Sequence, residues 1–78
     1  MIGMLWFDNS ESELAVKIER AAEYYREKYG KRPNLCFVHP SMEPPDRRVD
    51  GIEVRGTRAV MPNHFLVGVE QVQVAYEN

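Results

Sequence analysis

Two unbroken apolar runs, separated by one long amphipathic segment, constrain the fold of this chain more than any other feature. The first run is Met4 to Phe7 and the second is Leu35 to Val38. Four apolar residues without alternation are typical of strands covered on both faces, so we expect Trp6 and Phe7 in the core. A strand, a helix and a second strand of these lengths predict a β-α-β unit whose strands are parallel neighbours joined by a right-handed crossover.

The segment between the two runs predicts a helix from about Glu11 to Tyr29. Ser10 and Glu13 fit a capping box at its start, and Gly30 fits the left-handed position that ends a helix. Apolar residues recur at spacings of three and four, which gives the segment one apolar stripe and one charged face. The residues of this stripe are Leu14, Ile18, Ala21, Ala22, Tyr25 and Tyr29.

The middle of the chain predicts a surface loop followed by a hairpin. Residues 41–51 are rich in proline and charge and end in an Asp-Gly turn signal, which is typical of a loop. Residues 52–55 and 58–61 flank a two-residue turn that begins with glycine, so they predict a hairpin. Its register would place Arg55 directly opposite Arg58, an unfavourable pairing of like charges.

A last strand is predicted at residues 64–69. Residues 71–78 follow a change in the parity of the apolar positions, and we expect them to be either an edge strand or a frayed end. The whole chain, residues 1–78, is therefore expected to form one small α/β domain. Its architecture would be a β-α-β unit followed by a hairpin and a further strand, in a mixed sheet with one long helix on one face.

Composition narrows the class of protein but not its activity. The chain has 78 residues, 44% of them hydrophobic, and a net charge of −2. A core of this size is marginal, and oligomerisation is a common remedy. The single cysteine, Cys36, excludes an internal disulfide and is expected to act as a small buried hydrophobe. No signal peptide or membrane span is recognisable, so we expect a cytoplasmic protein without a membrane partner.

The carboxyl ends of the two predicted parallel strands are the best place to look for a binding site. Candidate ligand- or anion-binding residues there are Asp8, Asn9, Ser10, His39 and Ser41. Asp8 could orient His39 as a general base, and the helix start could hold an anion. Helix capping, however, explains Asp, Asn and Ser without a substrate. We assign no catalytic residue, cofactor or metal ligand, because no glycine-rich loop, nucleophile elbow or spaced histidine pair is present.

A second candidate site is a basic patch. Four arginines lie close together in the sequence at Arg47, Arg48, Arg55 and Arg58. If they gathered on one face they could hold an acidic partner or nucleic-acid phosphates. The acids interspersed with them favour an ordinary mixed surface, so nucleic acid is the alternative rather than the preferred partner.

One long helix is too narrow to shield both faces of such a sheet. The face without a helix must then be polar, covered by loops, or buried against another chain. Because the central runs are apolar, we expect self-association or another protein partner. The sequence thus favours a small non-catalytic interaction or accessory protein that acts as a homodimer. A small enzyme with a site at Asp8 and His39 is the least supported function.

Overall fold

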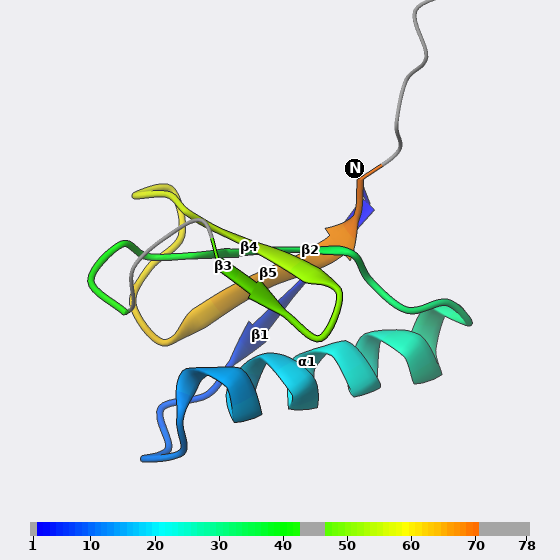
Figure 1. The fold of residues 1–78 in the computed structure, drawn as a ribbon, viewed down its shortest axis with the longest axis horizontal. Coiled ribbons are helices and arrows are strands. Elements are labelled where there is room, and N and C mark those ends of the chain that lie inside the picture. The colour runs from blue at the N-terminus through cyan, green and yellow to red at the C-terminus, as the bar shows by residue number, and fades with distance from the viewer. Residues whose placement is uncertain (1, 43–46, 71–78) are drawn as a thin grey trace, which may run out of the picture.

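The computed structural model describes residues 2–42 and 47–70, and these form one mixed sheet with one helix across one of its faces (Figure 1). The strand order is β1-β5-β2-β4-β3. The elements are β1 (Ile2–Phe7), α1 (Leu14–Tyr29), β2 (Leu35–Val38), β3 (Arg47–Val49), β4 (Ile52–Gly56) and β5 (His64–Val69). The predicted α/β class, with a β-α-β start and one helix on the sheet, is confirmed. Residues 71–78, for which an edge strand or frayed end was predicted, lie outside the described residues.

The two strands joined by α1 are parallel but are not neighbours. β5 lies between β1 and β2 and pairs antiparallel with both, with Trp6 opposite Phe65 and Phe65 opposite Val38. The expected direct pairing of β1 with β2 is therefore wrong. A crossover helix of this length spans a gap of one or two strands equally well, and β5 gains a ladder on each side by filling the gap. β5 and β2 thus form the centre of the sheet.

The predicted hairpin at residues 52–61 is also wrong. β4 pairs antiparallel with β3 through a tight turn at Asp50 and Gly51, and pairs parallel with β2 on its other side. Asp50 has φ 49° and Gly51 has φ 84°, the left-handed pair that a two-residue turn of type I′ requires. The Asp50-Gly51 pair, which was predicted to end a loop, therefore forms the hairpin turn between β3 and β4. Residues 58–61 form turns instead of a strand, so Arg55 does not face Arg58.

Helix α1 ends where the sequence predicted but starts later. Gly30 has φ 80° and donates its backbone N–H to the Arg26 carbonyl, which closes the helix at the expected residue. The N-cap is Glu13 rather than Ser10, and its side chain makes no capping hydrogen bond. The predicted capping box is therefore wrong, because Ser10 belongs to a turn that follows β1.

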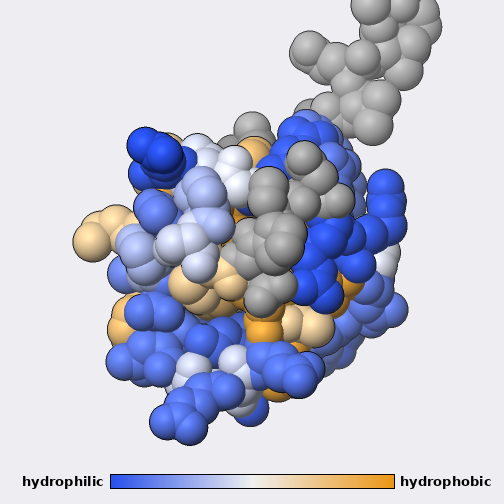
Figure 2. Space-filling model, turned by 60° about the vertical axis from the view of Figure 1, so that its left-hand side comes forward, coloured by the Kyte–Doolittle hydropathy of each residue, from blue (hydrophilic) through white to orange (hydrophobic). Residues whose placement is uncertain are grey.

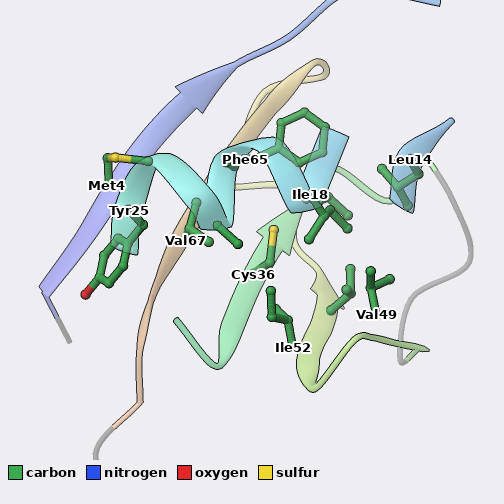
Figure 3. Close-up of a cluster of buried hydrophobic side chains, with 13 residues drawn as sticks. Met4, Leu14, Ile18, Tyr25, Cys36, Val49, Ile52, Phe65 and Val67 are labelled. Carbon is green, nitrogen blue, oxygen red and sulfur yellow. The ribbon is translucent and has the colours of Figure 1, made fainter. Parts of the chain in front are cut away.

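The core lies between α1 and one face of the sheet. Figure 3 shows Ile18 of the helix over Phe65 and Cys36 of the two central strands, with Met4 and Tyr25 at one end of the cluster. Ala21 and Ala22 are completely buried and let the helix backbone approach the sheet closely. Every residue of the predicted stripe of α1 lies in this cluster except Tyr29, which is 42% exposed.

The opposite sheet face, which we call the open face, has no helix over it in the described chain. Side chains alternate along each strand, and paired residues point the same way. The pairing of Leu5 with Leu66, and of Leu66 with Phe37, therefore places these three in one row. Phe7 and His64 lie beside them with ring centroids 5.0 Å apart.

Candidate functional site

Asp8 organises the connection from β1 to α1. Its carboxylate accepts a hydrogen bond from the Ser10 backbone N–H at 2.9 Å and pairs with the Arg20 guanidinium at 3.4 Å. The Asp8 side chain is 11% exposed, and hydrogen bonds from Ser10 and Arg20, together with the charge of Lys17, lower its pKa. These partners come from the chain itself, so the carboxylate is already satisfied as an anchor of the turn. Asn9, the neighbouring candidate, is exposed.

His39 and Ser41 form a separate local turn after β2. The Ser41 backbone N–H donates to Nδ1 of His39 at 3.1 Å, and the Ser41 hydroxyl lies 2.8 Å from the same nitrogen. The Met42 N–H closes the turn on the His39 carbonyl. These bonds hold the imidazole against its own loop.

The structure does not bring Asp8 and His39 together. β5 separates their strands, which places the strand axes about 10 Å apart. Because side chains alternate along a strand, Asp8 lies on the same side of the sheet as Trp6, the helix side, where it contacts Arg20. His39 lies on the same side as Phe37, which is the open face. In residues 2–42 and 47–70 no hydrogen bond or ion pair joins the two side chains. Figure 2 views this end of the molecule, and its surface mixes hydrophilic and apolar patches.

Replacing Asp8 by asparagine is expected to destabilise the fold by about 1 kcal/mol at neutral pH, since a hydrogen bond to a charged acceptor becomes one to a neutral acceptor. The folded-state pKa lies below the ordinary value of 3.8, so this contribution is present above pH 3.8. It is lost as the pH falls through the folded-state pKa. Urea unfolding of both proteins in a pH series should show the difference shrinking in acid. The control, Glu27→Gln at an exposed position of α1, should change stability little at neutral pH.

The four arginines of the predicted basic patch are not assembled into one positive surface. Arg55, on the open face, pairs with Glu53 at 2.7 Å and with Glu70 at 3.5 Å. The hydrogen bond from Arg55 lowers the pKa of Glu53, so this carboxylate stays charged. The β3–β4 register places Arg48 opposite Glu53 on the same face. Arg47 follows the other face of β3, and Arg58 lies in the turn after β4.

The most distinctive surface of the described chain is apolar. Leu5 is 62% exposed and Phe7 is 56% exposed, although Phe7 was expected in the core. Both project from β1 on the open face, beside the half-buried Phe37 and Leu66. The run from Met4 to Phe7 gives no local sign of this exposure. Only the position of β1 at the edge of the sheet, with the helix on one side, decides which of its residues meet solvent.

The remaining features of the described residues are a buried thiol and a shallow hollow. Cys36 is fully buried, and burial raises the pKa of its thiol to about 12, which keeps it protonated and unreactive. Among the described residues no three His, Cys, Asp or Glu side chains lie close enough to hold a metal ion. A shallow hollow of about 520 Å³ beside α1 is lined by Ala15, Val16, Glu19, Arg20, Glu23 and Val49.

Comparisons with protein-family models, with curated proteins and with solved structures gave no match for this chain. No helix in the described residues is long and apolar enough to cross a membrane.

Proposed function

We propose that this protein is a non-catalytic interaction module that works as a homo-oligomer in the cytoplasm. One observation carries the proposal: Leu5 and Phe7 stand exposed on the open face, next to the half-buried Phe37 and Leu66. Neighbouring apolar residues at the surface mark interaction sites, since a contact that covers them removes apolar area from water. Asp8 is engaged by Ser10 and Arg20, and His39 is engaged by Ser41, which supports binding rather than catalysis.

Nucleic acid is the alternative partner, and the charges argue against it. Arg48 and Arg55 share the open face with Glu53 and Glu70, so the positive charges there are matched by negative ones. Binding of nucleic acid depends on an excess of positive charge facing the phosphates. We therefore favour a protein surface, and specifically a second copy of the chain, as the partner.

The test is the molar mass of the purified chain, measured by light scattering over a wide range of concentrations. We expect a dimer that dissociates on dilution. Leu5→Glu places a charge in the proposed contact and should shift the chain to the monomer. Val16→Glu places the same charge at a 42% exposed position of α1, on the other side of the molecule, and should leave the dimer intact.

A wild-type chain that stays monomeric at every concentration would contradict the homo-oligomer. A dimer lost equally in Val16→Glu and Leu5→Glu would place the contact elsewhere than on the open face. Circular dichroism of each variant confirms that the fold is retained before its mass is interpreted.

A further inference from the structure

The outer edge of β1 carries backbone groups that no described strand uses. The Asp8 N–H bonds the Asn63 carbonyl, and these two residues continue the β1–β5 register. Ladder bonds alternate along an antiparallel pair, so the even-numbered residues of β1 point their N–H and C=O groups at β5. The same groups of Gly3, Leu5 and Phe7 therefore point outward, to the side where β1 has no neighbour in the described sheet.

Among the described residues, this edge lacks the features that protect sheet edges from pairing. β1 spans six residues in continuous register with β5, and Ile2 to Phe7 include no proline and no charged residue. The other edge of the sheet differs. β3 has only three residues, two of which are the exposed Arg47 and Arg48. Short length and charge are what proteins use to protect an edge, so β3 is protected and β1 is not.

The sequence of β1 is complementary to itself when two copies run antiparallel. With Leu5 opposite Leu5 of the partner, Gly3 of each copy lies opposite the partner's Phe7. All three outward-facing residues then make ladder bonds, giving about six hydrogen bonds across the pair. A twofold axis through this register is perpendicular to the sheet, so the open faces of both copies lie on the same side.

The side chains of the open face fit this register. The two Leu5 side chains, each 62% exposed in the single chain, become direct cross-strand neighbours. Phe7 lies across from Gly3, which has no side chain, so the aromatic ring has room to cover the partner's backbone there. Because β1 has no charged residue, no like charges meet at the axis, although each chain carries −2.

We propose that two copies of the chain pair through β1, antiparallel and with Leu5 opposite Leu5, to form one continuous sheet with both helices on one side. This inference rests on the proposed homo-oligomer and places its contact at the β1 edge of the open face, where it brings Leu5 and Phe7 against the partner and leaves Phe37 and Leu66 uncovered. We commit to a second copy as the occupant, because an antiparallel copy places Leu5 against Leu5 and each Phe7 against a Gly3. Such strand addition takes its affinity mainly from backbone hydrogen bonds.

The decisive variants change the same residue in two ways. Leu5→Pro removes an N–H that points away from β5, so it blocks the edge and spares the β1–β5 ladder. Leu5→Thr shortens the side chain and keeps the N–H. We expect Leu5→Pro to weaken dimerisation roughly hundredfold relative to Leu5→Thr. The symmetric contact loses two hydrogen bonds, one from the Leu5 N–H of each copy.

A crosslinking experiment tests the register independently. Residues opposite each other in a bonded antiparallel pair have Cα atoms about 5.5 Å apart, within reach of a disulfide. Leu5→Cys should therefore form a covalent dimer under mild oxidation, whereas Val16→Cys should not. Cys36 does not interfere, since it is fully buried.

The outcomes separate the two proposals. A wild-type monomer at all concentrations overturns both the homo-oligomer and the edge contact. A wild-type dimer in which Leu5→Pro dimerises as tightly as Leu5→Thr, and Leu5→Cys fails to crosslink, overturns the edge contact and leaves the homo-oligomer standing. Loss of dimerisation in Leu5→Pro with crosslinking of Leu5→Cys supports the register.

Discussion

Replacing Phe65 by alanine is expected to destabilise the fold by about 3–5 kcal/mol, close to the limit of what this chain can lose. Among the described residues, Phe65 is the largest fully buried side chain, and it lies on β5 in the core cluster against α1 (Figure 3). Removing its ring leaves a cavity that rigid strands on both sides cannot fill by collapsing. A domain of 78 residues has about 4–12 kcal/mol of total stability, so the variant should be partly or wholly unfolded at room temperature.

The matched control is Phe7→Ala, because it deletes the same side chain from a position that is 56% exposed. The substitution removes the contact with the His64 ring and little buried area, so the cost should stay below about 1 kcal/mol. Urea unfolding followed by circular dichroism gives both free energies. It is done at a chain concentration low enough for the chain to be monomeric, because Phe7 lies in the proposed dimer contact and dimerisation changes the apparent stability. Equal losses from Phe65→Ala and Phe7→Ala would contradict the assignment of the core to the helix side of the sheet.

Replacing Leu66 by proline is expected to prevent folding. Leu66 lies opposite Phe37 of β2. Two residues further along β5, the Gly68 carbonyl accepts a hydrogen bond from the Asn34 N–H, so it points toward β2. The Leu66 N–H therefore points at β2, between the two central strands. Proline removes this donor and leaves the Phe37 carbonyl without a hydrogen bond. Together with the steric misfit of the proline ring, this loss should destabilise the fold by more than about 3 kcal/mol.

Leu5→Pro is the control for the strand order, because Leu5 is the cross-strand partner of Leu66 on the same face. At the edge position its N–H has no ladder partner in the described sheet, so proline should leave a cooperatively folded chain. Thermal unfolding of the two variants distinguishes them. If β1 were a central strand beside β2, Leu5→Pro would be as damaging as Leu66→Pro, and that result would refute the strand order.

The local signals in the sequence were sufficient for some elements. The apolar stripe from Leu14 to Tyr25 fixes which side of α1 is buried, and Gly30 fixes its end, because both depend on residues within a few positions of each other. The apolar runs identified β1 and β2, and the final strand was found at its observed bounds. The start of α1 was placed too early because Ser10 is equally suited to a turn and to an N-cap.

The hairpin shows how two turn signals compete. Both Asp50-Gly51 and Gly56-Thr57 are compatible with a tight turn, and each is flanked by residues able to form strands. The fold uses the turn at Asp50-Gly51, because that turn lets β4 pair with β2 and β3 at the same time. Nothing within ten residues of either turn contains that information.

The sequence by itself determined the helix, the main strands and the expectation that one helix leaves apolar sheet surface uncovered, since these follow from local periodicity and from the width of a helix. Only the tertiary structure decided that β5 lies between β1 and β2. That insertion parts Asp8 from His39 and leaves β1 at the edge with Leu5 and Phe7 exposed. The physical reason is that strand order is selected by the summed pairing and burial of segments far apart in the chain, which no local pattern encodes.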